Sequence, residues 1–431
     1  MPCKAKTIKV DYLARVEGEG ALNITVSGGE IKRLQLKIFE PPRFFQSLLL
    51  GRKYDEVPDL VARICGICPA SHILASIQAL EQALDITPSE ETLRLRKLLA
   101  LSQWIQSHAL HTYMLALPDY FGYASVLEML PEYKSVVEQA LRLKRLGNDI
   151  TAAVGGREVH PVTAIVGGFT EVPDKETVKD LLKRLRAARQ DALDMVELTA
   201  AMKIPAFNRD CEFVALGCAN EYAVIDGILK SSRGMEVNKE AYRDQIQEIQ
   251  QPHSTALHSS IKGRGSFAVG PLARVNLNWE RLAKEAKSAA ENNGISFPSY
   301  NPFASIRARA LEMVHSIQSS IEILESLKLK AEQIPIKLKA GTGVGVKEAP
   351  RGLLYHCYRL DSEGYVEEAD IVSPTAHNVF NIENDLKEFV PGVLSLPDDE
   401  MTLKCEMLVR AYDPCISCSA HFLKLNIKNE A

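Results

Sequence analysis

Two Cys-x-x-Cys pairs stand far apart in this sequence, and they carry its clearest chemistry. Their members are Cys65, Cys68, Cys415 and Cys418. The spacing lets two thiolates face one metal ion from a single turn of the chain. Thiolates are soft ligands that suit zinc, copper(I), iron clusters and nickel. The residues therefore predict one metal centre built from both cysteine pairs.

A zinc site with four cysteines is the main structural alternative to a catalytic centre. The two pairs of such a site usually lie roughly 15–20 residues apart, whereas residues 69–414 separate these pairs. A zinc site that supports a small, weak core has no reason to join distant parts of a long chain. A redox-active dithiol is a further alternative, although two pairs that are both followed by a histidine fit it poorly. Spacing alone favours a catalytic metal and leaves structural zinc open.

The other cysteines are expected to be ordinary buried thiols, which behave as small hydrophobic groups. The chain has nine cysteines in all. An odd number in a long chain argues against a secreted domain stapled by disulfides. The five outside the two pairs are Cys3, Cys211, Cys218, Cys357 and Cys405.

Strands are predicted before the first cysteine pair. Apolar and polar residues alternate over Ala21–Val26 and again over Ile31–Phe39, and the turn signal Gly28-Gly29 lies between them. This pattern predicts a β-hairpin, which Pro41-Pro42 ends.

The middle of the chain is predicted to be mostly helical. Pro69 suits the first helical position after Cys68, and apolar residues then recur at helical spacing. A second helix is expected to begin after Ser89 and to stop at Pro118. Further helices are expected over Tyr133–Ala152, over Lys175–Met202 with Asp174 as its cap, and over Ser305–Glu332.

The pattern changes again after residue 333. Ile334–Ala340 alternates like a strand, and the glycines of the following Gly341–Gly345 predict a tight turn. Two strands and two helices are then expected, over Gly352–Leu360, Tyr365–Val372, His377–Phe389 and Asp398–Tyr412.

These elements predict an α+β fold that is mostly α, with a large central helical bundle and small β-containing lobes near the N- and C-terminal parts. We expect four segments: an N-terminal β-hairpin lobe over residues 1–60, a helical body over 61–333, a β-containing segment with metal ligands over 334–421, and a cleavable tail over 422–431.

The composition bears on partners and location. The net charge is −4, whereas proteins that bind nucleic acid usually carry a clustered basic surface, so no nucleic-acid partner is expected. No apolar run approaches the roughly 18 residues that span a bilayer, so no direct membrane span is expected. The N-terminal residues lack an apolar signal core. This favours the cytoplasm, although a chain can be exported with a partner that carries the signal.

Six motifs along the chain resemble, in order, the signatures of nickel–iron hydrogenase large subunits. The two cysteine motifs are Arg-x-Cys-Gly-x-Cys-x-x-x-His over residues 63–72 and Asp-Pro-Cys-x-x-Cys-x-x-His over residues 413–421. The other four are Arg15–Gly18, Gly155–Pro161, Glu348–Gly352 with His356, and Ser373–Thr375. The resemblance covers nearly the whole chain, and in particular it is to the cytosolic bidirectional group that is linked to NAD(P).

The resemblance implies reversible heterolytic cleavage and formation of dihydrogen at a buried nickel–iron centre. By the family pattern, Cys65 and Cys415 are terminal ligands of nickel, while Cys68 and Cys418 bridge nickel to iron. Iron in this family carries carbonyl and cyanide ligands. A dry, shaped cavity strengthens the charge interactions inside such a site.

The family pattern also implies a proton route. Cys415 is the candidate for taking the proton, and Glu17 is the candidate for carrying it away. Burial can raise the pKa of a carboxyl group until it exchanges protons near neutral pH. Without the resemblance, Glu17 would be interpreted as a solvated acid at the end of a strand.

Histidine and arginine side chains are implied beside the centre. His72 lies one helical turn after Cys68 and is expected to donate a hydrogen bond to a bridging sulfur. Arg351, which follows Pro350 in its motif, would direct its fixed fork of N–H groups at cyanide nitrogens. Three other histidines are expected to be core residues satisfied by carbonyl groups, namely His108, His111 and His160.

Two polar residues complete the expected support. Thr375 would offer its hydroxyl or its backbone N–H to the second cyanide. Asp413 is expected to pair with an arginine near the site, or to cap the turn that presents Cys415.

A second metal is implied less firmly. The family pattern places Gln46 where many members have a glutamate that binds magnesium, with His421 as its companion ligand. An amide oxygen is a weaker ligand for a hard cation than a carboxylate, which weakens the expectation of magnesium. Maturation in this family cuts after the last histidine, here His421. The sequence with residues 422–431 is therefore expected to be an unprocessed precursor, unless the chain is never cut.

Several partners follow from the resemblance. Electrons would pass to an iron–sulfur small subunit. They would continue to NAD(P) through flavin and iron–sulfur subunits, because no Gly-x-Gly-x-x-Gly opens a helix here. A maturation endopeptidase and metal-insertion chaperones are also expected. The alternatives are a subunit that reduces deazaflavin or viologen, a structural zinc protein, and a non-catalytic electron-transfer scaffold. Scaffolds of this fold lose the cysteines, and all four are present here.

Overall fold

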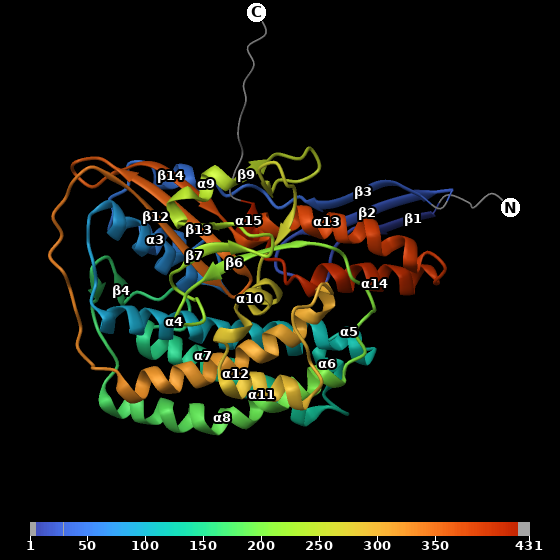
Figure 1. Cartoon of the computed structure of the whole chain (residues 1–431), viewed down its shortest axis with the longest axis horizontal. Coiled ribbons are helices and arrows are strands. Elements are labelled where there is room, and N and C mark those ends of the chain that lie inside the picture. Colours follow the sequence, from blue (N-terminus) through green and yellow to red (C-terminus); the bar gives the residue numbers. More distant parts are fainter. Residues whose placement is uncertain (1–5, 29, 421–431) are drawn as a thin grey trace, which may run out of the picture.

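One side of the molecule is formed by long helices alone, and most of the strands lie on the other side (Figure 1). A computed structural model describes residues 6–28 and 30–420. The helical side is built on four long helices: α4 (Glu90–Ala109), α7 (Lys134–Gly155), α8 (Lys175–Ala201) and α12 (Ser305–Ser326). The predicted α+β fold, mostly α, is confirmed. The division into four segments stays a prediction.

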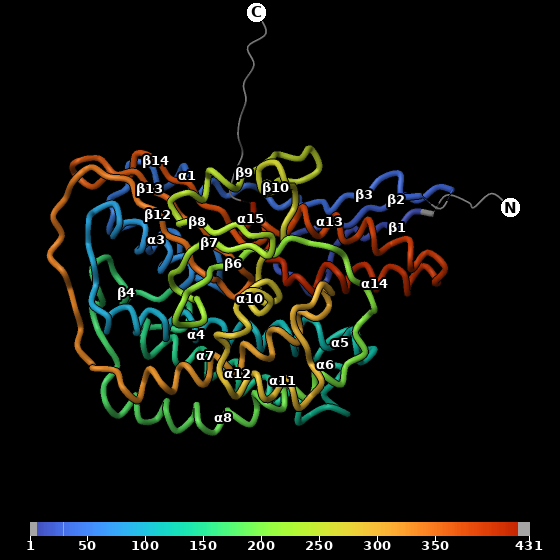
Figure 2. Tube along the Cα trace, viewed as in Figure 1, coloured from blue at the N-terminus to red at the C-terminus, as the bar shows by residue number. Residues whose placement is uncertain are grey.

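The N-terminal strands form an antiparallel sheet in the order β1-β2-β3. The expected hairpin is present as β2 (Gly20–Ser27) and β3 (Glu30–Ile38). The sequence analysis missed a third strand, β1 (Lys6–Val10), which pairs with β2. Apolar residues of this sheet share one hydrophobic cluster with helices α13 (Pro374–Val393) and α14 (Asp398–Ala411). The first strands of the chain therefore pack on its last long helices, as the blue and red parts of Figure 2 show.

Two predicted helix ends are wrong. Pro118 does not stop the second helix, because α4 continues through a π-helical turn, Leu110–Ala116, into α5 (Leu117–Phe121). Pro118 lies in the first turn of α5, where a proline needs no hydrogen-bond partner. α12 ends at Ser326 rather than at Glu332. Glu332 instead lies at the start of α4, where its carboxylate accepts hydrogen bonds from Ser89 N at 2.9 Å and from Ser89 Oγ at 2.8 Å.

The glycine-rich segment after residue 340 is a strand, not the predicted turn, and Ile334–Ala340 is not the predicted strand. β12 (Gly341–Ala349) begins at the first glycine and pairs with β13 (Gly352–Leu360), which pairs with β14 (Val366–Val372). Alternate glycines of β12 face helix α3 (Pro69–Ala83), and a Cβ atom on Gly343 would lie 2.0 Å from Ala79 O. The same close approach joins Gly341 to Ala83 and Gly345 to Ala75. Glycine is required here because the strand lies directly on the helix backbone.

The remaining elements are short. The helices are α1 (Phe45–Leu49), α2 (Val57–Ala62), α6 (Val126–Met129), α9 (Tyr242–Gln245), α10 (Pro271–Asn278), α11 (Lys284–Asn292) and α15 (Ile416–Ser419). The strands are β4 (Ala164–Ile165), β5 (Gly168–Phe169), β6 (Glu212–Gly217), β7 (Ile228–Ser231), β8 (Glu236–Val237), β9 (Ile246–Ile249), β10 (His258–Ile261) and β11 (Phe267–Ala268). Within the described part of the chain, no helix combines the length and apolar character needed to cross a membrane.

Candidate metal centre

The structure brings the four cysteine thiols together inside the main hydrophobic core. The sulfur of Cys415 lies 3.6 Å from that of Cys65 and 2.7 Å from that of Cys418. Cys68 and Cys418 share a second group with a ring nitrogen of His72, in which all three ligand atoms lie within 4.8 Å of one another. None of the four cysteines is more than 4% exposed.

The first pair is held by the start of α3. Cys68 is the residue before the helix, and Pro69 opens it, as the sequence predicts. The backbone N–H groups of Ile67 and Cys68 donate to Cys65 Sγ at 3.3 and 3.2 Å. Contacts with the other thiols hold the pKa of Cys65 well below its usual value, although burial opposes this. These contacts favour the thiolate form of Cys65.

The second pair is held by the N-terminal motif that contains Glu17. Glu17 and Cys415 form a parallel β-bridge, and Ile416 N donates to Glu17 O at 2.8 Å. Gly18 lies against the same turn with a positive φ of 87°, and a Cβ atom there would lie 2.8 Å from Ser417 N. The Glu-Gly pair therefore needs its glycine because residues 416–417 occupy the space of a side chain.

The carboxylate of Glu17 lies against the cysteine sulfurs. Its Oε2 atom accepts hydrogen bonds from Cys415 Sγ at 3.0 Å and from Ser417 N at 3.1 Å. Burial raises the pKa of Cys415 well above its usual value, so the thiol is the donor in this contact. The structure thus places the proposed proton donor and acceptor within direct hydrogen-bond distance.

Arg351 and Asp413 form a buried ion pair next to the cysteines. Arg351 Nε donates to Asp413 O at 2.9 Å, and a terminal nitrogen of Arg351 donates to Asp413 Oδ1 at 3.1 Å. Burial opposes the charge, but Asp413 and the nearby sulfur atoms of the cysteines hold the pKa of Arg351 well above its usual value. Arg351 Nη1 and Asp413 Oδ2 are buried and have no hydrogen-bond partner among the described residues.

His72 stands at the end of a line of hydrogen bonds. Tyr358 Oη lies 2.6 Å from His356 Nδ1, and His356 Nε2 lies 3.1 Å from His72 Nδ1. Burial raises the pKa of Tyr358 and lowers the pKa of His72 to about 4. The proton placement that satisfies all three groups has Tyr358 and His356 donating, which leaves an N–H on His72 Nε2. That atom has no partner in the described part of the chain.

Thr375 supports the second pair from another direction. Its Oγ1 atom accepts a hydrogen bond from Cys415 N at 2.9 Å. Thr375 lies in the first turn of α13, whose preceding residue Ser373 caps the helix by accepting from Ala376 N. The Ser-Pro-Thr motif therefore fixes the start of a helix and turns one hydroxyl toward Cys415.

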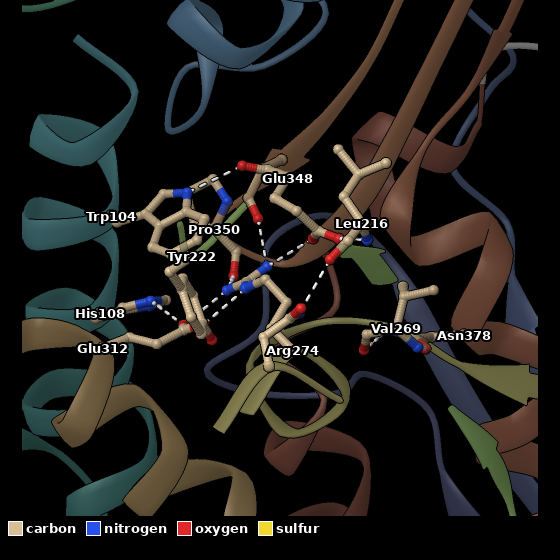
Figure 3. Close-up of polar contacts among 12 residues, drawn as sticks. Trp104, His108, Leu216, Tyr222, Val269, Arg274, Glu312, Glu348, Pro350 and Asn378 are labelled. Atoms are coloured by element: carbon tan, nitrogen blue, oxygen red, sulfur yellow. Dashed lines mark hydrogen bonds and ion pairs between the residues drawn. The ribbon is translucent and has the colours of Figure 1, made fainter. Parts of the chain in front are cut away.

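Arg274, which was not predicted from the sequence, contacts the turn directly before Arg351. Figure 3 shows Arg274 with Pro350, Glu312 and Glu348. Arg274 donates to Ala349 O at 2.8 Å and to Pro350 O at 3.0 Å. It also forms fully buried ion pairs with Glu312 at 2.6 Å and Glu348 at 3.1 Å. No motif marks Arg274, because it lies in the short helix α10 far from both cysteine pairs along the chain.

Side chains from several helices and strands contact Arg274 and the carboxylates paired with it. Trp104 Nε1 donates to Glu348 O at 3.0 Å, and the Arg274 guanidinium lies 4.2 Å from the Trp104 ring centre. Burial raises the pKa of Glu348 to about 7, although Arg274 opposes the shift. Burial would also raise the pKa of Glu312, but Arg274 holds it below its usual value. His108 lies 2.9 Å from the Glu312 carboxylate (Figure 3).

Other sequence-predicted residues lie outside this cluster. His108 contacts a carboxylate rather than the expected carbonyl, whereas His111 Nε2 lies 2.8 Å from Arg410 O as expected. His160 lies in the loop after α7, half-buried, and its carbonyl accepts from Arg157 Nε. The Gly155–Pro161 motif therefore shapes a loop and places no ligand among the cysteines.

At Gln46, the residue predicted to bind a second metal, the structure shows an amide beside an ion pair. The Gln46 amide donates to Asp370 Oδ1 at 3.4 Å, and Asp370 Oδ2 accepts from Arg243 Nε at 2.6 Å. A guanidinium thus already neutralises the carboxylate beside Gln46. His421 lies outside the described residues, so its companion role and the processing site stay predictions.

Comparisons with known proteins identify the family of this chain. A model of the nickel-dependent hydrogenase family matches residues 43–139 and 262–421. The chain is 37% identical to the alpha chain of sulfhydrogenase 1 from Pyrococcus furiosus, over 97% of this chain and 98% of that protein. It belongs to the nickel-dependent hydrogenase family. It is therefore an oxidoreductase, the large catalytic subunit of a nickel–iron hydrogenase.

Further relatives cover the same length. The chain is 30% identical to one chain of the F420-non-reducing hydrogenase from Methanothermobacter thermautotrophicus, over 96% of this chain and 94% of that protein. Among solved structures, an NAD⁺-reducing [NiFe]-hydrogenase in its H₂-reduced state superposes with a TM-score of 0.84 and 26% sequence identity. That match covers 98% of this chain and all of the other.

The donors present in this hydrogenase subunit fit a centre of nickel and iron. Four thiol sulfurs are soft ligands, and they converge in a dry site. Three buried polar atoms around them lack partners among the described residues, on Arg351, His72 and Asp413. Buried polar atoms without partners are costly in a folded protein. These atoms are where the protein would contact the ligands of a bound metal group.

Proposed function

We propose that this subunit cleaves and forms dihydrogen reversibly at a nickel–iron centre held by its four cysteines. When bound, the centre supplies the metal orbitals on which dihydrogen is polarised and split heterolytically. The observation that carries the proposal is the convergence of two distant Cys-x-x-Cys pairs on one buried point, with a carboxylate directly against the Cys415 sulfur. The assignment of Cys65 and Cys415 as terminal ligands and of Cys68 and Cys418 as bridging ligands follows the family pattern.

The protein's own groups divide the remaining work. Cys415 Sγ holds the proton released in the reaction, and Glu17 Oε2 receives it across 3.0 Å. Arg351 Nη1, which has no partner among the described residues, would donate to a cyanide on the iron, and His72 Nε2 would donate to a bridging sulfur. Thr375 keeps Cys415 in place through the backbone bond at 2.9 Å. The apolar residues around the cysteines exclude water, which strengthens each of these contacts.

Electrons leave through a partner subunit with iron–sulfur clusters and continue to NAD(P) in the cytoplasm. Among the described residues, every group of potential metal ligands that contains cysteine lies at this one centre, so the electron relay belongs to another chain. The likeness to an NAD⁺-reducing [NiFe]-hydrogenase over nearly the full length supports NAD(P) as the acceptor. Maturation by an endopeptidase and metal-insertion chaperones completes the proposal.

Metal analysis and infrared spectroscopy on the native complex test the centre. About one nickel and one iron per chain are expected, with bands in the carbonyl and cyanide stretching region. Zinc without such bands, in protein cut after residue 421, would overturn the proposal and favour the structural zinc alternative. Hydrogen-dependent reduction of NAD⁺ or NADP⁺ tests the acceptor. Reduction of viologen or deazaflavin alone would reject the NAD(P) assignment and leave the centre unaffected.

The substitution Glu17→Gln tests the proton route. The amide still accepts from Ser417 N but no longer exchanges a proton with Cys415, so dihydrogen turnover should fall by about 10²–10⁴-fold. Nickel, iron and the infrared bands should remain. Glu19→Gln is the matched control, because Glu19 lies two residues away and binds Tyr12 Oη instead. Wild-type turnover in Glu17→Gln would show that the proton leaves by another route.

A further inference from the structure

A second cluster of potential metal ligands lies away from the cysteines. It is built around the middle of helix α13. It consists of His253, His258 and Glu383, whose ligand atoms all lie within 4.8 Å of one another. Glu383 follows Thr375 by eight residues on α13, which separates the two sites by about 12 Å along the helix axis. His258 begins β10, and His253 lies in the loop between β9 and β10. This hairpin lies beside α13 (Figure 2).

The protons of His258 show which nitrogen is available to a ligand. His258 Nδ1 lies 3.3 Å from Ala256 O, and a carbonyl only accepts, so Nδ1 carries the hydrogen. The hydrogen on Nδ1 leaves Nε2, the ring nitrogen that faces Glu383, as the atom available to a ligand. A ring that donates through one nitrogen to a backbone carbonyl and offers the other is the usual state of a metal-bound histidine.

The lone pair of His258 faces a carboxylate without a hydrogen between them. His258 Nε2 lies 3.8 Å from Glu383 Oε2, which is too long for a hydrogen bond. His258 is 1% exposed, and its Nε2 has no partner within residues 6–28 and 30–420. A cation bound between the imidazole nitrogen and the carboxylate would contact both of these acceptors.

Glu383 and His253 are also held in place by their neighbours. Glu383 Oε1 accepts from Leu36 N at 2.9 Å and lies 2.8 Å from His253 Nε2. The side chain of His253 is 14% exposed, so the cluster opens to solvent at this histidine. Thr255 fastens the loop to the N-terminal sheet by donating from its backbone to Ile38 O at 2.8 Å. The three side chains are therefore held by three separate elements that meet at one point.

We propose that His253, His258 and Glu383 bind a divalent transition-metal ion, with zinc as the best match. Two imidazoles and one carboxylate are a common zinc donor set that leaves a fourth position for water. Around a tetrahedral zinc with bonds of about 2.0–2.1 Å, neighbouring ligand atoms lie roughly 3.3 Å apart. The separations of 2.8 and 3.8 Å from Glu383 bracket that value. The ion ties the β9–β10 loop to α13 and, through Glu383, to β3.

Metal content and X-ray absorption of the purified native complex test the proposal. About one zinc per chain is expected in addition to nickel and iron, with nitrogen and oxygen as its nearest neighbours. Sulfur neighbours would place the zinc at the cysteines and overturn the proposal. A complex without zinc that also fails to bind added Zn²⁺ after chelator treatment would overturn it as well.

Two variants separate binding from folding. His258→Ala should lose the zinc while keeping nickel and iron. His253→Gln keeps the buried part of the site, so it guards against a simple failure to fold. It should weaken zinc binding at least tenfold and abolish the rise in melting temperature that added Zn²⁺ gives the wild-type complex. His160→Ala, which removes a histidine from a distant surface loop, should leave zinc unchanged. Equal zinc content in all three variants would reject the site.

Discussion

The two cysteine pairs meet at one point, but different kinds of structure hold them there. The first pair stands at the start of α3, whose backbone lies directly on the glycine face of β12. The second pair lies in a short turn after α14. The turn is fixed by the bridge to Glu17, by the contact of Thr375 with Cys415 N and by the contact of Arg351 with Asp413. The first half of the centre therefore rests on a helix packed against a strand, whereas a β-bridge, the close approach of Gly18 and a few hydrogen bonds position the second half.

The two buried arginines of the site, Arg274 and Arg351, also differ in how completely their hydrogen bonds are satisfied. Arg274 uses all three of its guanidinium nitrogens on Glu312, Glu348 and the carbonyl groups of the 349–351 turn. Arg351 is equally buried, yet one of its nitrogens lacks a partner among the described residues. A fully paired buried arginine fits a structural role, and the unused donor of Arg351 fits contact with a bound group. The first half of the centre should hence respond to mutation through stability, and the second through function.

Arg274→Met should produce the largest effect. The substitution leaves Glu312 and Glu348 buried without their cation, which should lower the free energy of unfolding by about 3–5 kcal/mol. Chemical denaturation of the purified complex, followed by circular dichroism, measures the change. Arg189→Met is the control, because Arg189 pairs with Glu285 at the half-exposed surface and such pairs contribute little. A loss below about 1 kcal/mol for Arg274→Met would erase the contrast between the two arginines.

Gly343→Ala tests the close packing beneath the first pair. The new Cβ atom would lie 2.0 Å from Ala79 O, so strand and helix must separate at a cost of about 1–3 kcal/mol. Thermal unfolding monitors the loss. Gly392→Ala is matched to it, because nothing lies within 4 Å of a Cβ atom on that helical glycine. Equal melting temperatures in the two variants would mean that the α3–β12 contact does not hold the first pair.

These two halves were predicted from the sequence to different extents. Spacing and resemblance named every cysteine and both Arg351 and Glu17, because short motifs carry ligands in a fixed local pattern. They missed Arg274, since a buried ion network depends on which helices meet in space. Glycine spacing over Gly341–Gly345 was misread as a turn for the same reason. In an isolated segment, a run of glycines indicates a flexible backbone or a turn. Here each alternate glycine instead packs against a backbone carbonyl of a helix that lies more than 250 residues earlier in the chain.

Thr375→Val should give the smallest change in stability of the three substitutions. Its main effect should be on the nickel content and the dihydrogen turnover of the centre. The valine keeps the shape of the side chain but leaves Cys415 N without its acceptor, which costs about 1 kcal/mol. Because that loss falls on the turn that presents Cys415, it should appear as lower nickel content and lower dihydrogen turnover while the melting temperature barely moves. Thr199→Val controls for the loss of a buried hydroxyl, since Thr199 Oγ1 only donates to Val196 O inside α8. If both variants kept full nickel and turnover, the second pair would be held as firmly as the first, and packing rather than single hydrogen bonds would have to explain both.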